Sequence, residues 1–564
     1  MTTIGIDLGT TNSLVAYWTD KGAVIIPNVL NSNIIPSVVS IDDNGEILVG
    51  QIAKERLISH PHMTAASFKR YMGTEKTFNM GKYSFSPQEL SSFILKSLKA
   101  DAEAYLGEEV INAVISVPAY FNDAQRKATK RAGELAGLKV ERLISEPTAA
   151  AISYGLHNEE SETQFLVFDL GGGTFDVSIL ELFEGVMEVK SIAGDNFLGG
   201  EDFTNLLASH FIKKNNINIQ NLDYKERSAI HKQAEVCKVA LSQDQAWKMS
   251  LAIKDKNCEV NINREEFEKI SNELLLKLRR PIERALSDAS LSPSDLDAVV
   301  LIGGSTRMPV VKSVVSKMFG KLPYSNINPD EAVALGAAIQ AALKDRNEDL
   351  KEIILTDVCP YTLGTNVVKQ MGDDKYEDGY FFPIIERNTP IPVSRVERLY
   401  SACDNQRKIK IQVYQGESRR VENNIKLGEI HIGIPKAPAG EQAIDVRYTY
   451  DINGILEVEV IVVETGFKNR IVIEKNPGSI SKEEIEIRLR ALDNIKIHPR
   501  EKTENRLLLA RGERLYEENL GEKRSYITNL LQRFEAALAS QEDKLIKREG
   551  KILKEKLDKI EGFE

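Results

Sequence analysis

The sequence predicts a multidomain protein in which an α/β part is followed by an antiparallel β-sandwich and a helical C-terminal segment. Three observations support this prediction. A strand–glycine turn–strand pattern occurs twice among alternating strand and helix patterns. Apolar and polar residues alternate with period two from residue 359 to about 473. The remainder is rich in Lys, Glu and Leu. At 564 residues, the chain is long enough for about three or four domains.

The second copy of the glycine pattern is residues 165–178 (FLVFDLGGGTFDVS). An apolar run meets three glycines and resumes as an alternating pattern, which predicts two strands joined by a tight turn. Glycine lets backbone N–H groups approach a phosphate closely, and Thr174 adds a hydroxyl donor. Asp169 and Asp176 would then face the accompanying cation. A plain hairpin explains this segment equally well when it is taken alone.

The first copy is residues 4–15 (IGIDLGTTNSLV), in which Asp7 and Gly9 correspond to Asp169 and Gly171. The separation of the two copies is the length of one domain, which predicts two like halves facing each other across a cleft. The two turns would then bind the phosphates of a nucleotide from both sides. The carboxylates of both copies would lie close to the metal ion that accompanies the phosphates. The helix-dipole P-loop motif does not occur in the sequence.

Composition excludes several classes of protein. A net charge of −10 argues against nucleic acid or anionic lipid as the main partner. The four cysteines lack C-x-x-C spacing, and the seven histidines cluster only at His60 and His62, so neither a disulfide framework nor a zinc site is indicated. The N-terminus does not resemble a signal peptide, and no apolar run approaches the roughly 18 residues of a membrane helix. We therefore predict a cytoplasmic protein without membrane contact.

The first half contains further signals of strands and helices. A hairpin is expected at residues 43–45 (DNG), and a Lys69-Arg70 pair follows in a weakly helical stretch, a pattern typical of solvated surface. Ser86 is expected to cap a helix that runs through Leu106.

A short strand at residues 114–117 precedes a helix that is capped by Asn122 or Asp123 and extends to about Gly137. Glu146 precedes a proline at the start of the next helix. It is either a plain capping residue or a carboxylate aimed into the cleft.

The second half contains a glycine turn at residues 195–202 (DNFLGGED) before a helix. Glu235, Lys238 and Ser242 share one face of a later helix, and exposed ion pairing is the default interpretation of that pattern. Residues 301–309 (LIGGSTRMP) predict a strand entering a Gly-Gly turn, where a flat ring could approach and stack on Arg307. Another helix is expected to open at residues 329–331 and to end near Lys344.

After this helix the chain becomes a charged linker with a short aliphatic patch at residues 353–355 (IIL), which suggests that the linker docks part of the time. Residues 408–414 alternate strictly, and Asn453-Gly454 is a hairpin signal within the predicted sandwich. A helical tail is expected from Ser481, with breaks at His498-Pro499, Gly512 and Gly521.

Taken together, these motifs resemble the DnaK-type, seventy-kilodalton heat-shock chaperone family over nearly the whole chain. Residues 4–13 and 165–178 resemble its two phosphate motifs, and residues 301–309 resemble its adenosine motif. Residues 117–123 (VPAYFND) and 146–151 (EPTAAA) match its connecting segments. The compact tail and residues 68–73 (FKRYMG) look most like the HscC branch of the family.

The resemblance implies an actin-like ATPase with two RNase H-like lobes that uses ATP/ADP and Mg²⁺, with K⁺ as a further candidate ion. Lys69, Glu146, Asp169, Thr174 and Asp176 would be the catalytic residues, with Lys69 near the γ-phosphate and the attacking water. Asp7 and Asp169 would hold the metal largely through water. The residues expected to bind the nucleotide are Gly9, Thr10, Thr11, Asn12, Gly171, Gly172, Gly173, Thr174, Gly199, Gly200, Glu201, Glu235, Lys238, Ser242, Gly303, Gly304, Ser305, Arg307 and Asp330.

The resemblance also implies an ATP-dependent chaperone that binds extended apolar segments of unfolded proteins and acts in protein folding and the stress response. Leu399, Ala402, Ile409 and Ile411 are placed at the peptide groove by the match around residues 401–406 (SACDNQ). ATP would dock the linker on the ATPase and loosen the peptide, with coupling positions at Pro118, Arg126, Ile353, Ile354, Leu355 and Asp357. A J-domain co-chaperone and a nucleotide exchange factor are the implied partners.

The chain departs from the family pattern at several places. The loop after Leu363-Gly364 is longer and charged, from Lys369 to Asp378, so the residues that arch over the peptide are not assigned. Ser145 and Thr356 replace the asparagine and the aliphatic residue that are usual there, which puts the choice of J-domain partner in doubt.

We expect four segments: the ATPase at 1–348, a linker at 349–358, the sandwich at 359–479 and a helical lid at 480–564. A small-molecule kinase of the same actin-like class would need a catalytic acid and a sugar site. That kinase and an actin-like filament protein both leave the sandwich unexplained.

Overall fold

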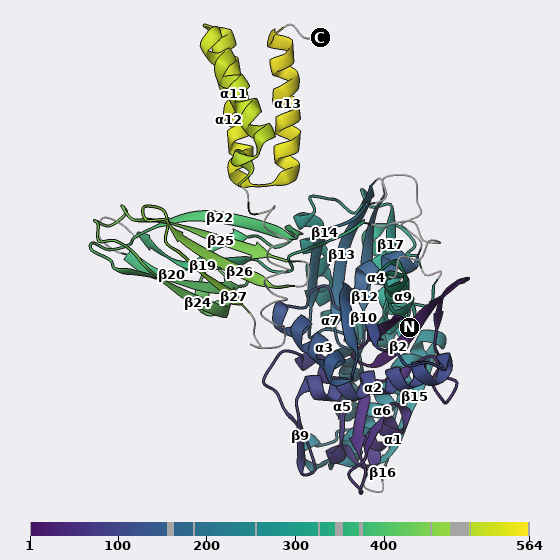
Figure 1. Cartoon of the computed structure of the whole chain (residues 1–564). Coiled ribbons are helices and arrows are strands. Elements are labelled where there is room, and N and C mark those ends of the chain that lie inside the picture. Colours follow the sequence, from purple (N-terminus) through teal and green to yellow (C-terminus); the bar gives the residue numbers. More distant parts are fainter. Residues whose placement is uncertain are drawn as a thin grey trace. The chain divides into compact units, whose positions relative to one another are not determined.

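The computed structural model describes residues 2–154, 163–183, 186–253, 256–324, 327–344, 354–370, 376–451, 454–473, 496 and 498–561. The chain divides into two compact units, Met1–Tyr361 and Thr362–Glu564, which are coloured purple to teal and green to yellow in Figure 1. The finer division into four segments stays a prediction. No helix within these described ranges is long and apolar enough to span a bilayer.

The first unit contains two sheets of the same topology, as the repeated motif predicts. In one sheet the order is β11-β10-β1-β2-β3, and in the other β17, β12, β13 and β14 follow one another. β1 is antiparallel to β2 and parallel to β10, and β12 is likewise antiparallel to β13 and parallel to β17. The strands of the two sheets are β1 (Ile4–Leu8), β2 (Asn12–Thr19), β3 (Gly22–Ile25), β10 (Asn112–Val117), β11 (Lys139–Ser145), β12 (Thr163–Leu170), β13 (Phe175–Phe183), β14 (Val186–Asp195) and β17 (Ala298–Ile302).

Helices follow the strands in both halves of this unit (Figure 1). They are α1 (Gln51–Ser59), α2 (Pro87–Leu106), α3 (Asp123–Leu135), α4 (Glu146–Ser153), α5 (Gly200–Lys214), α6 (Tyr224–Gln243), α7 (Arg264–Asp288), α8 (Pro309–Phe319) and α9 (Ala332–Lys344). The smaller strands are β4 (Ile35–Pro36), β5 (Val38–Ile41), β6 (Ile47–Val49), β7 (Thr64–Ala66), β8 (Phe78–Met80), β9 (Tyr83–Phe85), β15 (Ala246–Ile253) and β16 (Lys256–Asn263).

Two of the predicted helix caps are confirmed. Ser86 and Glu89 form a reciprocal capping box at the start of α2, and Gly107 ends that helix in the left-handed conformation. Asn122, rather than Asp123, caps α3. These caps determine the residue at which each helix begins. They therefore also determine where the loop between the preceding strand and that helix ends.

Helix α9 joins the two halves because its small residues permit close packing. A Cβ on Gly336 would lie 1.8 Å from the carbonyl oxygen of Ala149 in α4, and a Cβ on Gly5 of β1 would lie 2.1 Å from the amide of Ala338. Glycine is therefore required at both contacts. α9 thus packs tightly against β1 of the first half and against α4, the helix that precedes the second half in the chain.

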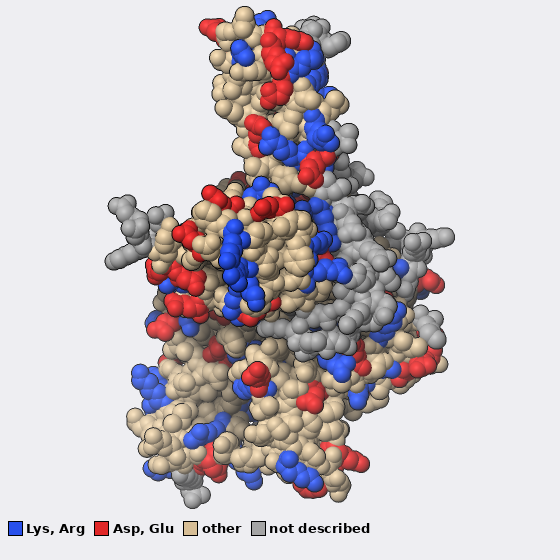
Figure 2. Space-filling view, turned by 60° about the vertical axis from the view of Figure 1, so that its left-hand side comes forward, with Lys and Arg blue, Asp and Glu red and all other residues tan. Residues whose placement is uncertain are grey.

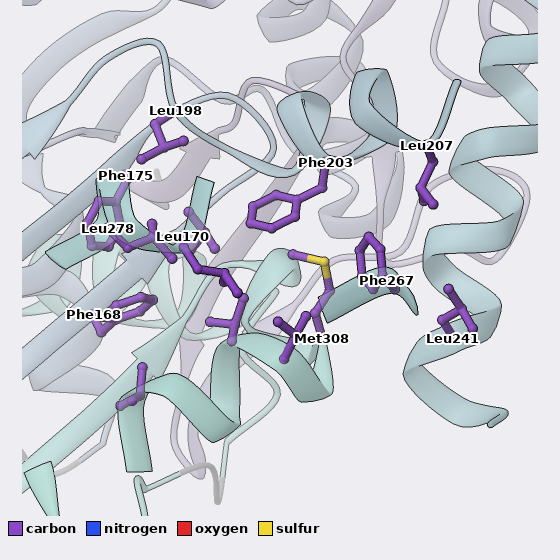
Figure 3. Close-up of a cluster of buried hydrophobic side chains, with 14 of the residues drawn as sticks. Phe168, Leu170, Phe175, Leu198, Phe203, Leu207, Leu241, Phe267, Leu278 and Met308 are labelled. Carbon is purple, nitrogen blue, oxygen red and sulfur yellow. The ribbon is translucent and has the colours of Figure 1, made fainter. Parts of the chain in front are cut away.

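The β12–β13 hairpin stands on a rigid core. Phe168 and Phe175 pack with Phe203 of α5 and Phe267 of α7, and all four side chains are fully or almost fully buried (Figure 3). Burying a phenylalanine contributes about 2 kcal/mol. The glycine turn between β12 and β13 is consequently held in place by its own strands.

Part of the predicted linker forms a strand of the first unit. β18 (Ile354–Val358) pairs in parallel with β14, with Leu355 opposite Met187. Ile353, which was predicted to belong to the same aliphatic patch, lies outside the described residues. The backbone of Ile354 and Leu355 thus extends the sheet that carries Asp169 and Asp176.

The second unit contains the predicted antiparallel sandwich. One sheet has the order β20-β19-β23-β24 and the other β22-β25-β26-β27. The hydroxyl of Tyr448, which is fully buried, donates across to the carbonyl of Gly364 in the opposite sheet. The strands of the two sheets are β19 (Leu363–Gln370), β20 (Tyr376–Ile385), β22 (Val393–Tyr400), β23 (Lys408–Gln415), β24 (Ile425–Gly433), β25 (Ala443–Tyr450), β26 (Leu456–Val462) and β27 (Lys468–Ile473), and β21 (Pro390–Ile391) is a further short strand outside them.

The structure refines one prediction for the second unit and overturns another. Lys369 lies in β19 and Asp378 in β20, so both ends of the charged segment belong to strands, whereas residues 371–375 lie outside the described residues. Gly512 does not break the tail. It lies inside α11 (Thr503–Glu518), where a Cβ would come within 2.5 Å of the Leu531 side chain, so this glycine permits close helix packing.

The helical tail forms a bundle of α11, α12 (Glu522–Ser540) and α13 (Asp543–Glu561), drawn in yellow-green to yellow in Figure 1. Its core contains Leu515, Ile527, Phe534 and Leu557. The predicted break at Gly521 is confirmed, since this residue adopts a positive φ of 63° before α12. The predicted helix start at Ser481 lies outside the described residues.

Charged side chains of both signs are interspersed over the face shown in Figure 2. Among the described residues on that face, no broad basic area appears.

Candidate functional site

The two predicted hairpin turns contact each other. A Cβ on Gly172 would lie 1.8 Å from the Thr11 hydroxyl, and a Cβ on Gly173 would lie 2.5 Å from the methyl group of Thr10. The glycine turn of the second half therefore packs directly against the threonine turn of the first half. This contact requires residues without a Cβ, which a plain isolated hairpin would not.

A third turn closes against the same glycines from the start of α5. The N–H groups of Gly200 and Glu201 donate to the carbonyls of Gly171 and Gly172 at 3.0 and 2.8 Å. A Cβ on Gly199 would lie within 2.7 Å of the backbone of this turn. The N-terminus of α5, where a helix favours negative charge, is thus held beside the two hairpins.

Lys69 is buried, so its interpretation as solvated surface was wrong. It is only 2% exposed, and its ammonium group lies 2.9 Å from the carboxylate of Glu146 at the start of α4. The short 3-10 turn η2 (Phe68–Tyr71) turns both Phe68 and Lys69 inward. Glu146 is likewise buried, and its partner shows that it is more than a helix cap.

Three buried aspartates surround this ion pair. Burial raises the pKa of Asp7 to about 7 and the pKa of Asp176 to about 8. It raises the pKa of Asp169 well above its ordinary value, and the negative charge of Glu146 adds to each increase. Asp7 accepts a hydrogen bond from Ser116 at 2.7 Å, whereas neither carboxylate oxygen of Asp176 has a partner of good geometry.

These carboxylates fit a divalent cation that is held mainly through water. A buried carboxylate without a hydrogen-bond partner is costly, and a nearby cation offsets that cost. Among the described residues, no group of three His, Cys, Asp or Glu side chains converges closely enough to ligate a metal directly. Carboxylate oxygens are nevertheless the ligands that hard divalent cations prefer.

The raised pKa values predict a pH dependence of the nucleotide-free protein. A carboxyl group whose pKa is higher in the folded state stabilises the fold below its unfolded pKa of about 4, and this stability is lost as pH rises. For Asp7 and Asp176 the loss should extend up to about pH 7 and 8. We expect the melting temperature to fall between pH 5 and 8, and Mg²⁺-ATP to reduce the slope. Equal slopes with and without Mg²⁺-ATP in differential scanning fluorimetry would contradict this prediction.

The helix face carrying Glu235, Lys238 and Ser242 is only partly exposed. The ammonium group of Lys238 is buried, lies 2.7 Å from Glu235 and donates to the carbonyl of Gly200 and the hydroxyl of Thr204. An ordinary exposed ion pair does not explain these bonds. They tie α6 to the first turn of α5, beside the glycine turns.

The predicted adenosine turn also joins this cluster. Gly303 adopts a φ of 82°, and a Cβ there would lie 2.4 Å from the Leu170 carbonyl oxygen. The Ser305 hydroxyl donates to the carbonyl of Gly171 at 2.8 Å. A Cβ on Gly304 would lie 2.7 Å from a carboxylate oxygen of Asp330, which is bound by Arg307 at 2.7 Å.

Of the other predicted nucleotide residues, Gly9 donates its N–H to Ser13 at 3.2 Å, and Asn12 opens β2. Thr174 is buried, and its carbonyl accepts a bond from Gly171 N–H across the turn. The structure therefore gathers these positions around one set of turns.

Sequence reasoning did not assign an ion pair that links the two halves. Arg70 lies 2.7 Å from Asp202, and the same carboxylate oxygen accepts the N–H of Gly199 at 2.8 Å. The only signal in the sequence was the position of Arg70 beside Lys69 and of Asp202 in the first turn of α5. Pairing between the two halves could not be inferred from either position.

Two of the predicted coupling positions, Pro118 and Arg126, lie in the segment that follows β10. Arg126 is buried and donates to the carbonyls of Phe121 and Ala119. Its guanidinium also lies 4.0 Å from the carboxylate of Asp357 in β18. The carbonyl of Pro118 accepts the N–H of Phe121 at 3.2 Å. The structure thus connects the linker strand with the segment that follows β10.

The predicted groove residues lie on β22, on β23 and between them. Ile409 and Ile411 are buried on the inner face of β23. Leu399 is half-buried near the end of β22, and Ala402 lies in the connection between the two strands, where its N–H donates to Gln406.

Comparison with known proteins agrees with this architecture. A family model described as Hsp70 protein matches residues 3–563. The proteins named "Chaperone protein DnaK" from Thermotoga petrophila and Thermotoga maritima are each 46% identical over 485 residues, which cover 83% of this chain and 80% of the relative. Both the extent and the identity of these matches establish common descent across both units. The chain belongs to the Hsp70 family.

Proposed function

We infer that the protein is an ATP-dependent molecular chaperone, an ATPase whose affinity for polypeptide segments changes with the bound nucleotide. The observation that carries this conclusion is the contact of two Gly/Thr turns above buried carboxylates, in a chain that also contains a β-sandwich unit. A small-molecule kinase of the same actin-like class would not need the second unit for its activity. The alternative is therefore not favoured.

We propose that the three turns bind the phosphates of ATP or ADP with Mg²⁺. Backbone N–H groups and the threonine hydroxyls would face the phosphate oxygens, and Asp7 and Asp169 would hold the metal through water. When bound, Mg²⁺ neutralises charge on the phosphates. Lys69 would place positive charge near the γ-phosphate, and Glu146 and Asp176 would orient the attacking water and receive its proton. Positioning and charge neutralisation are most of what phosphoryl transfer requires.

We further propose that extended apolar polypeptide segments bind at Leu399, Ala402, Ile409 and Ile411. Backbone hydrogen bonds to a strand with a small apolar pocket would suit such ligands without demanding one sequence. A J-domain co-chaperone, a nucleotide exchange factor, K⁺ as a second ion, a cytoplasmic location and membership of the HscC branch remain predictions from the resemblance.

The linker strand provides a physical route for coupling. β18 pairs with β14 at Val186–Glu188, and Gly194 near the other end of β14 lies opposite Asp176 of β13. Docking of the linker therefore adds a strand to the sheet that contains a proposed catalytic carboxylate. Any such coupling is reciprocal, so peptide binding should alter ATP affinity by the same factor as ATP alters peptide affinity.

The test is the steady-state ATPase rate of the full chain with and without a panel of apolar peptides. We expect peptides to stimulate the wild-type protein several-fold. The Ile354→Asp/Leu355→Asp double variant should keep its basal rate but lose the stimulation, because charged residues disfavour docking of the strand. ATP hydrolysis that no peptide stimulates, together with phosphorylation of a small molecule, would favour the kinase instead.

A further inference from the structure

Two buried serines close the first glycine–threonine turn, which lies between β1 and β2. Ser13 and Ser37 are each at most 1% exposed. The N–H of Gly9 donates to the Ser13 hydroxyl at 3.2 Å, and the two serine hydroxyl oxygens lie 2.9 Å apart. The Ser37 hydroxyl donates to the carbonyl of Gly9 at 2.8 Å. Both polar groups of one glycine are therefore joined in a ring of hydrogen bonds, which we call the serine ring.

The direction of every hydrogen bond in the serine ring is determined. A serine hydroxyl has one proton, and Ser37 uses its proton for the Gly9 carbonyl, which can only accept. Ser13 must therefore donate to Ser37, while its oxygen accepts the N–H of Gly9. Each bond in such a chain polarises the next. We therefore expect removal of one hydroxyl to weaken the whole ring.

The corresponding turn of the second half is closed in a different way. There the N–H of Gly171 donates to the carbonyl of Thr174 across the turn at 3.1 Å. In the first half the N–H of Gly9, which corresponds to Gly171, binds a side chain instead. The closure of the first turn thus depends on Ser37, which is 28 residues away from Gly9 in the chain.

Ser37 also binds the first turn through its backbone, because its N–H donates to the carbonyl of Thr11 at 2.7 Å. The following residue, Val38, begins β5 and lies opposite Ala66 of β7. Ser37 is therefore the residue at which the first turn joins the strand pair β5–β7.

The strand pair β5–β7 leads to the proposed catalytic lysine. β7 ends at Ala66, and the short turn η2, which contains Lys69, begins at Phe68. The Phe68 side chain is buried and belongs to the same hydrophobic core as Val39 of β5. Packed strands therefore connect Lys69 with Ser37, and through Ser37 with the first turn.

We propose that Ser37 is a positioning residue for ATP hydrolysis, whose hydroxyl and N–H hold the first turn in the correct position relative to Lys69. The second turn, the start of α5 and the predicted adenosine turn are proposed to bind the same nucleotide. Loss of the serine ring should therefore slow the reaction more than it weakens ATP binding. This inference rests on the proposed binding of phosphates at these turns.

The test is single-turnover ATP hydrolysis by the full chain, measured together with the Kd of Mg²⁺-ATP. In Ser37→Ala we expect a rate about tenfold lower and a Kd changed by less than about threefold, because a small displacement of groups around the reacting phosphate slows the reaction. Ser13→Ala breaks the same ring and should lower the rate to the same extent. The double variant should be at most about twofold slower than either single variant, because groups that act as a unit do not contribute additively.

The matched control is Ser40→Ala. Ser40 is a fully buried serine of β5, and its hydroxyl bonds the Thr64 hydroxyl and the Met63 carbonyl rather than the first turn. This variant should lose a similar amount of thermal stability, measured by scanning fluorimetry, but should hydrolyse ATP at the wild-type rate.

The outcomes separate this inference from the proposed function. A wild-type rate in Ser37→Ala overturns the positioning role, as does an equal loss of rate in Ser40→Ala or a loss confined to ATP affinity. Effects that multiply in the double variant, to about a hundredfold, overturn the ring as a unit. Each of these results leaves the proposed function intact, whereas failure of the wild-type chain to bind Mg²⁺-ATP overturns both.

Discussion

Replacing Lys69 with alanine is expected to lower the single-turnover rate of ATP hydrolysis by at least about a hundredfold, with ATP affinity changed only a few-fold. Lys69 is buried beside Glu146, and its ammonium group lies 2.9 Å from that carboxylate. A fixed buried cation stabilises charge that develops during phosphoryl transfer more strongly than the ground state. Quenched-flow hydrolysis and equilibrium nucleotide binding would measure the two quantities separately.

Loss of Lys69 also leaves Glu146 buried without its partner, which can destabilise a protein by several kcal/mol. The double variant Lys69→Met/Glu146→Gln removes both charges and should restore much of the melting temperature. It should not restore hydrolysis, because the cation is still absent. Lys99→Ala is the matched control, since Lys99 pairs with Glu103 on the surface of α2. Single-turnover hydrolysis near the wild-type rate in the alanine variant would refute the role of Lys69.

The sequence was sufficient to predict the duplicated framework of the site. Residues 4–15 and 165–178 contain the same order of apolar strand, Asp, glycine turn and second strand, and the structure pairs them in sheets of the same topology. Such a pattern is local, because period-two alternation and consecutive glycines act through neighbouring residues. Helix caps such as Ser86 were predicted for the same reason.

Local patterns failed where distant residues decide the environment of a side chain. Lys69 is followed by Arg70 in a polar stretch that is typical of surface, yet its partner Glu146 is 77 residues away in the chain. Lys238 shares a helix face with Glu235 but is also bonded to Gly200, which belongs to another helix. Burial of a charge depends on tertiary packing, and only the family resemblance pointed to Lys69.

The same reasoning explains the wrong prediction at Gly512. A glycine within a helical pattern is a reasonable candidate for a helix end, because it costs about 1 kcal/mol relative to alanine in a helix interior. Here Leu531 of α12 occupies the space that a Cβ would need. The close approach of two helices therefore outweighs the local preference.

Replacing Gly199 with alanine is expected to weaken ATP binding at least tenfold and to abolish most of the increase in melting temperature that Mg²⁺-ATP produces. The backbone of Gly199 is extended, with a φ of −175°, so its conformation does not require glycine. Its contacts do: an added Cβ would lie 2.6 Å from the Gly173 amide and 2.7 Å from the Gly172 carbonyl oxygen. The turn before α5 would have to move away from the glycine turn, separating groups proposed to hold the same phosphates.

The control for this substitution is Gly433→Ala at the end of β24, where an added Cβ meets nothing closer than 3.9 Å. It should leave nucleotide binding and the stabilisation by Mg²⁺-ATP unchanged. Isothermal titration calorimetry and scanning fluorimetry of both variants would compare them directly. Wild-type ATP affinity in Gly199→Ala would show that the turn can move without cost, and the tight packing of the three turns would then not be what holds the nucleotide.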